Sequence, residues 1–238
     1  MEKRHQRIPQ EVLKLIACIT MLIDHFGAAI VPYLPIPHMV GVYYTCRIIG
    51  RIAFPIYCFL LVEGMRRTRN PKKYILRLGI GILLAEIPFD LLFEGGFSWA
   101  YQSVMVTLTL GALMLFCMRK TEKKWLKLLM VLPFAVLAEL AKCDYGGWGI
   151  AMIAVFALFD SFTLKLLGVL FVSAAMPSAG ITVFGVFFSC ELAALLAMLP
   201  IGFYSGGKLT YNRALQWGFY LFYPVHLLVL WMILLILR

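Results

Sequence analysis

Apolar residues gather in long blocks along the whole chain, and short basic or Gly- and Pro-rich segments separate these blocks. Blocks of this length cross a bilayer as helices, and no alternation typical of membrane strands runs through them. The pattern predicts an all-α, polytopic transmembrane bundle of about nine helices, with roughly eight to ten as the range. The predicted spans are 11–33, 41–65, 77–93, 102–118, 126–142, 147–160, 164–176, 181–199 and 215–237.

Composition agrees with this class. Hydrophobic residues make up 62% of the 238 positions and charged residues 14%, whereas a soluble domain is about half apolar and a quarter charged. A single membrane domain over 1–238 is the simplest organisation, although the short spans 147–160 and 164–176 could instead form a re-entrant pair. The six cysteines show no CxxC spacing, so neither a disulfide framework nor a metal site is predicted.

The net charge of +10 is distributed unevenly between the predicted loops. Loops 34–40 and 93–101 contain no Lys or Arg, whereas the loops that alternate with them are basic. This positive-inside pattern predicts a multi-pass protein of the cell (inner or plasma) membrane with a cytoplasmic N-terminus. Topology and contact with membrane lipids explain the basic loops, with ligand binding as the alternative, and nucleic acid is not an expected partner.

Ionisable residues inside the spans need a partner or a wet cavity, because a charge at bilayer depth is costly. Lys14 and His25 are 11 residues apart in the first span, which puts them on nearly the same helix face and roughly 16 Å apart along the axis. A cation at the cytoplasmic end and a base near mid-membrane would suit the phosphates and the thioester arm of acetyl-CoA. The alternative is that Lys14 snorkels and His25 hydrogen-bonds another helix.

Other polar residues in the spans fall into pairs. Asp24 precedes His25, and it could pair with Arg47 or Arg51, which lie one turn apart in the second span. Further candidates are Glu86 and Asp90 in the third span, Asp144 and Tyr145 after the fifth, and His226, which follows Pro224 in the last. A proline kink with re-satisfied polar groups is the alternative reading of the His226 segment.

Four segments resemble the TraX family of membrane proteins, which is named for the F-pilin N-acetylase of conjugation systems. They are Leu22–His25, Arg51–Gly64, Glu86–Asp90 with the earlier Tyr74–Leu78, and Phe219–His226, and Cys143–Gly146 adds support. The chain departs from the family pattern at Gln102, where Asn is usual, and at Ser205, where the family has a Tyr-Asn-Gly turn. Both departures concern the specificity for the acceptor.

TraX proteins are similar in turn to transmembrane acyltransferases, which move acetyl groups from cytosolic acetyl-CoA to acceptors across the membrane. That group has a basic residue ten positions ahead of a catalytic histidine, and these two residues correspond here to Lys14 and His25, which are 11 positions apart. It also has paired arginines in an early helix, to which Arg47 and Arg51 correspond with a spacing that differs by one residue. The resemblance therefore implies the reaction type.

The sequence thus predicts a membrane-bound O- or N-acetyltransferase that uses acetyl-CoA as donor and needs no metal. The expected catalytic residues are His25, as general base or acetyl carrier, with Asp24 and with Arg51 as oxyanion donor. Coenzyme A would contact Lys14, Arg47, Arg66, Arg67 and Lys73. The extracytoplasmic acceptor, a pilin-like N-terminus or a glycan, would enter near Glu86, Asp90, Asp144, Tyr145 and His226.

Two other classes of function fit the same buried charges. A transporter or flippase would use them as a proton or substrate relay, but long chains of acidic residues or repeated halves are lacking. A structural component of a conjugation or secretion assembly would use them to join helices. The identity of the acceptor, the choice between an acetyl-histidine and direct transfer, and the oligomeric state stay open.

Overall fold

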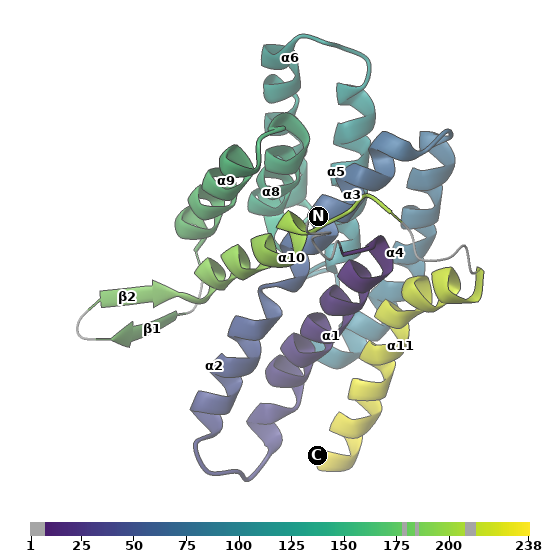
Figure 1. The fold of residues 1–238 in the computed structure, drawn as a ribbon. Helices are drawn as coiled ribbons and strands as arrows, with labels where there is room; N and C mark the ends of the chain where they lie inside the picture. Colours follow the sequence, from purple (N-terminus) through teal and green to yellow (C-terminus); the bar gives the residue numbers. More distant parts are fainter. Residues whose placement is uncertain (1–7, 178–179, 184–185, 208–212) are drawn as a thin grey trace, which may run out of the picture. The chain divides into compact units, whose positions relative to one another are not determined.

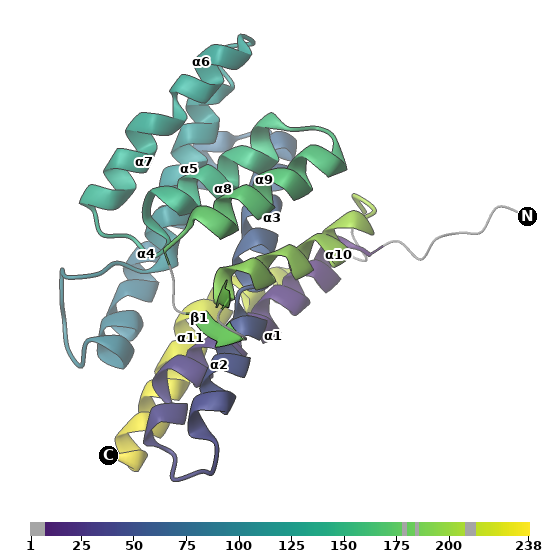
Figure 2. The same ribbon diagram turned by 90° about the vertical axis from the view of Figure 1, so that its left-hand side faces the viewer.

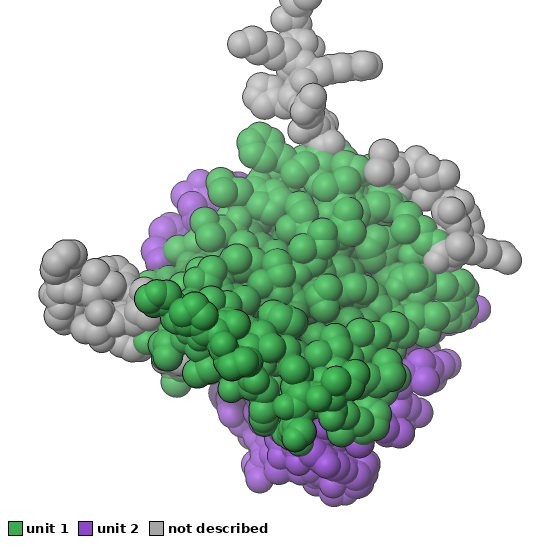
Figure 3. Space-filling model, turned by 90° about the horizontal axis from the view of Figure 1, so that it is seen from below, with its two compact units in different colours: residues 1–57, 173–238 green, residues 58–172 purple. Residues whose placement is uncertain are grey.

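The computed structural model describes residues 8–177, 180–183, 186–207 and 213–238, and these residues are predominantly helical (Figures 1 and 2). They form two compact units, coloured separately in Figure 3. The first unit combines the N-terminal residues up to Tyr57 with the segment from Ser173 onwards, and the second unit spans Cys58–Val172. Both boundaries fall inside helices, in α3 (Ala53–Arg67) and α9 (Phe162–Ala175).

In the first unit, α1 (Gln10–Ala29) and α2 (Met39–Gly50) form an antiparallel pair joined through the short 3-10 helix η1 (Val31–Tyr33), and α11 (Arg213–Leu237) packs beside α1 (Figure 1). The 3-10 helix η2 (Cys190–Ala197) packs on α2 and continues into α10 (Met198–Gly202). Before α1, the backbone at Ile8 pairs with Tyr204 as a parallel bridge. Chain segments from both halves of the sequence therefore surround α1.

One predicted span has a different structure. Residues 181–199 were expected to form a continuous helix, but Gly180–Val183 (β1) and Val186–Ser189 (β2) form an antiparallel hairpin, with Gly180 opposite Ser189. Positions 184 and 185 of that span lie outside the described residues. The strands are rich in β-branched and aromatic residues, which favour extended backbone, and helical turns begin only at Cys190.

The second unit is formed by helices, with α5 packed against α4, α7 and α8. Asn70 caps α4 by accepting a hydrogen bond from the backbone N–H of Lys73, and Pro71 occupies the first helical position, where its missing N–H costs nothing. The predicted span 126–142 is divided between α6 and α7. The helices of the second unit named in this paragraph span the following residues: α4 (Pro71–Phe93), α5 (Val104–Met118), α6 (Lys124–Leu129), α7 (Val131–Leu140) and α8 (Gly146–Leu158).

Three stretches among the described residues are long and apolar enough to cross a membrane, judged by length and composition: Gln10–Tyr33, Met39–Arg67 and Trp217–Leu237. Shorter apolar helices occur at Val104–Met118, Gly146–Leu158, Phe162–Ala175 and Cys190–Gly202. The predicted helical class is therefore confirmed, whereas nine complete crossings stay a prediction.

The exposed helix faces are apolar. On α1, Leu15 and Ile19 are about half exposed, and on α4 and α11 Leu83 and Ile236 are 74% and 84% exposed. Many large apolar side chains are exposed in this way, and such exposure suits contact with lipid. The exposed side chains therefore indicate a lipid environment, as the hydropathy of the helices does.

The close packing of α1 against α2 depends on Gly50. A β-carbon added at this position would collide with the Asp24 side chain, whereas one at Gly41 of the same helix would meet nothing within 4 Å. We expect Gly50→Ala to lower the free energy of unfolding by about 1–3 kcal/mol, because the packed neighbour must move. The control Gly41→Ala should be neutral or stabilising by up to about 1 kcal/mol. Thermal unfolding in detergent micelles measures both, and equal midpoints for the two variants would contradict the expectation.

Candidate active site

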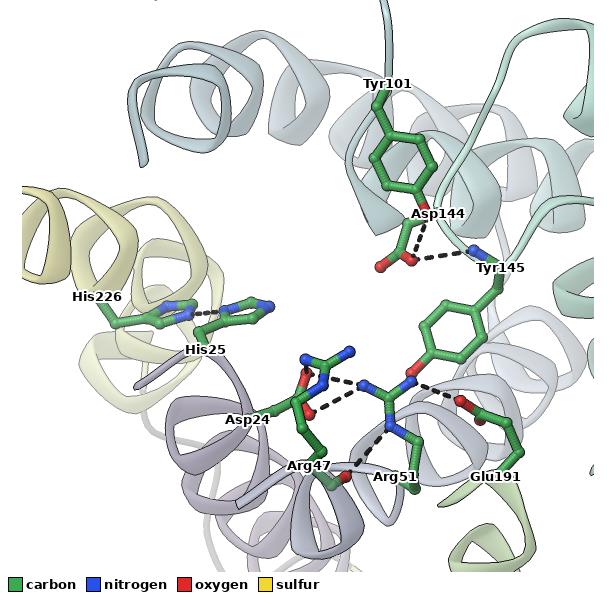
Figure 4. Close-up of polar contacts among 9 residues, drawn as sticks. All are labelled: Asp24, His25, Arg47, Arg51, Tyr101, Asp144, Tyr145, Glu191 and His226. Carbon is green, nitrogen blue, oxygen red and sulfur yellow. Dashed lines mark hydrogen bonds and ion pairs between the residues drawn. The ribbon is translucent and has the colours of Figure 1, made fainter. Parts of the chain in front are cut away.

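Two histidines from the first and last helices meet in the first unit (Figure 4). Nδ1 of His25 on α1 lies 2.7 Å from Nε2 of His226 on α11, although 201 positions separate the residues in the sequence. The two rings are almost coplanar, with 3° between their planes. Both residues are buried, at 9% and 5% exposed. The predicted catalytic base therefore has a second imidazole as a direct partner.

The backbone of α11 holds the second ring. Nδ1 of His226 lies 2.7 Å from the carbonyl oxygen of Phe222, one turn earlier. Pro224 lies within this turn and has no N–H to donate, so helical hydrogen bonding is interrupted there. The ring of Tyr223 contacts His226 and His25 edge-on, with centroid distances of 5.5 and 6.1 Å. Local sequence and packing therefore fix the orientation of the pair.

A buried network of ion pairs begins at the residue beside His25. Asp24 accepts hydrogen bonds from Arg47 at 2.7 Å and from Arg51 at 2.9 Å, and Arg51 also donates to Glu191 on η2 at 2.7 Å (Figure 4). Two guanidinium groups thus face two carboxylates, and the charges balance. Such charge-assisted bonds compensate for the cost of removing the ions from water. The predicted pairing of Asp24 with an arginine of the second span is confirmed.

The face of α1 that carries His25 is also polar towards its N-terminus. Nζ of Lys14 lies 5.2 Å from the centre of the Phe219 ring of α11. One turn further along α1, the Cys18 thiol lies 3.3 Å from the hydroxyl of Tyr57 on α3. Lys14, Cys18 and His25 therefore follow one another on one side of the helix, as their spacing predicts.

Two of the basic residues predicted to contact coenzyme A, Arg66 and Arg67, interact with groups of their own unit. Arg66 donates to the carbonyl oxygen of Ala157 at 3.1 Å, and Arg67 pairs with Glu63 at 2.7 Å. Their side chains are 43% and 46% exposed. Lys73 is exposed in the first turn of α4. Their role towards coenzyme A stays a prediction.

Two predicted acceptor-binding acids of α4 are tied to the segment before α5. Glu86 accepts hydrogen bonds from the backbone N–H and the hydroxyl of Ser103, the latter at 2.6 Å. Asp90 is 2% exposed, and its Oδ2 accepts from the backbone N–H of Ser98 at 3.1 Å. Both carboxylates therefore order the chain between α4 and α5.

The turn between α7 and α8 holds two more predicted acceptor residues. Asp144 accepts hydrogen bonds from the hydroxyl of Tyr101 at 3.0 Å and from the backbone N–H of Tyr145 at 3.1 Å (Figure 4). Tyr145 has a left-handed backbone conformation, with φ of 63°, at the start of α8. In the same turn, burial and, to a smaller extent, the Glu86 carboxylate raise the pKa of the Cys143 thiol to about 11. This cysteine is therefore a neutral thiol at physiological pH.

Comparison with known proteins identifies the family. The family model described as TraX protein matches residues 9–234, a range that includes both histidines and all four members of the ionic network. The chain belongs to the TraX family. It is 29% identical over 237 residues to the probable fimbrial assembly protein FimC, serogroup H1, of Dichelobacter nodosus, covering 92% of each chain. It is also 30% identical over 112 residues to an uncharacterized protein of Rickettsia prowazekii (strain Madrid E), covering 47% of this chain and 38% of that one. No solved structure shows a significant match.

In this TraX-family protein, one member of the buried network was not among the predicted site residues. Glu191 pairs with Arg51, yet its predicted span gave no reason to assign it a partner. The sequence feature that could have identified it is its isolation: Glu191 is the single charged residue between positions 181 and 199. A lone acid in an apolar stretch requires a buried cation.

The residues that meet at this TraX-family site are able to transfer protons. Among the residues that the structure describes, no group of three or more His, Cys, Asp or Glu side chains could hold a metal ion. A pair of imidazoles can accept and pass on a proton, and a neutral imidazole nitrogen can also act as a nucleophile. The adjacent guanidinium groups supply fixed positive charge.

Proposed function

We propose that this TraX-family protein is an acetyl-CoA-dependent integral membrane acyltransferase, which moves an acetyl group from the cytosol to an extracytoplasmic amine or hydroxyl. The observation that carries the proposal is the buried His25 imidazole, held by a second histidine and flanked by the network around Asp24. Structural interactions between helices alone do not require two hydrogen-bonded imidazoles. General acid–base chemistry does require a positioned imidazole.

In the proposed reaction His25 acts as general base. The acceptor amine or hydroxyl attacks the acetyl carbonyl carbon, its proton moves to His25, and the new C–N or C–O bond replaces the C–S bond of the thioester. The proton then passes to the departing thiolate, which leaves as free coenzyme A. In the covalent variant of this route, His25 attacks the acetyl carbonyl carbon and breaks the C–S bond, so that coenzyme A leaves as its thiolate; the acceptor then attacks the acetyl-imidazole, breaks its C–N bond and gives up its proton.

The other residues of the first unit support this chemistry. Lys14, on the same helix face as His25, is proposed to attract the phosphates of coenzyme A as a point charge. Arg51 is held by Asp24 and Glu191, and its fixed guanidinium favours negative charge developing on the thioester oxygen. The proposed location is the cell membrane, with the N-terminus in the cytoplasm, which gives Lys14 access to cytosolic acetyl-CoA.

The name of the Dichelobacter nodosus relative supports a second candidate function. That protein is described as a probable fimbrial assembly protein, so this chain could be a structural component of a fimbrial or secretion assembly. In that role the network between α1, α2 and η2 would serve only to hold the helices together. The two candidates differ in whether the chain turns over acetyl-CoA.

The proposal is tested by reconstituting the purified chain in proteoliposomes and supplying radiolabelled acetyl-CoA. We expect release of free coenzyme A, and Lys14→Ala should raise the KM for acetyl-CoA by about tenfold, equivalent to about 1.4 kcal/mol of binding energy. Lys14→Arg should preserve the KM, and Lys124→Ala, which removes an exposed charge from α6, is the matched control. Pilin-like peptides and amino sugars are added as acceptors. If acetyl-CoA turnover still does not exceed that of empty liposomes, the acyltransferase is excluded and the assembly role is favoured.

A further inference from the structure

We infer that His226 is a positioning residue, which fixes His25 in the tautomer that carries its hydrogen on Nδ1 and its lone pair on Nε2. This inference rests on the proposed function and deepens it, because it names the reactive atom. The sequence placed His226 among the acceptor-binding residues, whereas the structure puts its ring against the base.

The assignment follows from counting hydrogens along the chain of contacts. The Phe222 carbonyl oxygen can only accept, so Nδ1 of His226 at 2.7 Å must be the donor. A neutral His226 then has a lone pair on Nε2. Nδ1 of His25 lies 2.7 Å from this nitrogen and must donate to it. In a neutral His25 this leaves the lone pair on Nε2.

The opposite tautomer of His25 is disfavoured by the same geometry. It would direct the Nδ1 lone pair of His25 at the Nε2 lone pair of His226 across 2.7 Å, within a buried site. The near-coplanar rings place the donated hydrogen along the line between the two nitrogens, where a hydrogen bond is strongest. The arrangement resembles the orienting role of the aspartate in a serine protease triad, with a neutral acceptor in its place.

The same contact serves the charged form of His25. When Nε2 takes the proton of the acceptor, the Nδ1–H of the resulting imidazolium still faces the His226 lone pair, and this hydrogen bond becomes charge-assisted. The proton on Nε2 remains available to the thiolate that leaves the thioester. His226 therefore holds the base in one orientation through the whole transfer and need not touch the substrate.

Two amide replacements of His226 separate positioning from packing. A glutamine puts its amide oxygen near the former Nε2, where it can accept from His25. An asparagine puts its amide near the former Nδ1, where it can donate to Phe222 but cannot reach His25. We expect His226→Gln to stay within about tenfold of the parent kcat and His226→Asn to fall by about 10²-fold or more, with an unchanged KM for acetyl-CoA. Loss of the orienting partner in a protease triad costs about 10⁴-fold. Equal kcat values for the two variants would overturn the inference.

A spectroscopic measurement tests the tautomer without catalysis. Protein labelled with ¹⁵N-histidine, in a background of His5→Gln and His38→Asn, contains only His25 and His226 as labelled residues. Nε2 of His25 should have a pyridine-like shift and Nδ1 a pyrrole-like shift in the parent and in His226→Gln, and the two should average in His226→Asn. A pyrrole-like Nε2 in the parent would overturn the inference. If the parent gives the expected spectrum but no turnover, the proposed function fails while the tautomer stands.

Discussion

Replacing His25 with alanine is expected to lower turnover of acetyl-CoA by at least about 10²–10⁴-fold, the usual contribution of a positioned general base. If His25 instead forms an acetyl intermediate, the loss is larger, because the covalent route disappears. Binding of acetyl-CoA should change little, since the phosphates and adenosine lie at the far end of the molecule from the thioester. Binding by calorimetry and turnover by release of free thiol, measured on the same preparation, separate the two effects.

The matched control is the exposed histidine His38, which precedes α2. Its backbone is left-handed, with φ of 58°, so His38→Asn is preferable to alanine because asparagine tolerates this conformation. We expect His38→Asn to retain parental turnover. If the His25→Ala variant turned over acetyl-CoA as fast as this control, the acid–base mechanism would be wrong.

Replacing Arg51 with methionine is expected to lower the free energy of unfolding by about 3–5 kcal/mol, because both of its carboxylate partners are buried and Glu191 loses its cation. Methionine retains most of the apolar stem, so the loss reports on the charge. The control Arg67→Met removes an exposed i,i+4 ion pair with Glu63 and should cost no more than about 1 kcal/mol. Denaturation by SDS in mixed micelles compares the variants.

A second set of substitutions distinguishes uncompensated charge from general loss of packing. Adding Glu191→Gln to Arg51→Met removes the carboxylate that has lost its cation, while Asp24 keeps its ion pair with Arg47, and stability should partly recover. If the double variant is less stable than Arg51→Met alone, Glu191 has another essential partner and the network explanation is wrong.

The sequence was sufficient for the elements that depend on local patterns. The apolar blocks predicted the helical class, the direction of Asp24 on its helix predicted that it could pair with Arg47 or Arg51, and the motifs predicted the TraX family. The paired strands Gly180–Val183 and Val186–Ser189 were missed because hydropathy is equally high in apolar strands and apolar helices. Branched and aromatic side chains there were the stronger local signal.

Contacts between distant segments were beyond sequence reasoning. His25 and His226 were both selected, but nothing in their spacing shows that their rings meet edge to edge. Glu191 was similarly visible as an isolated acid without a partner. These contacts depend on which faces of α1, α2, η2 and α11 pack together, and periodicity alone does not choose among apolar faces of similar composition.

The distance along the chain between the two histidines has a consequence for biogenesis. Ribosomes synthesise α1 well before α11, so His25 exists long before its partner has been made. Until α11 inserts, the first helix carries an imidazole and a carboxylate whose eventual neighbours are incomplete. Nascent chains arrested before α11 should therefore contain the base but hold it in no defined orientation, and competence for transfer should arise only when the final helix docks.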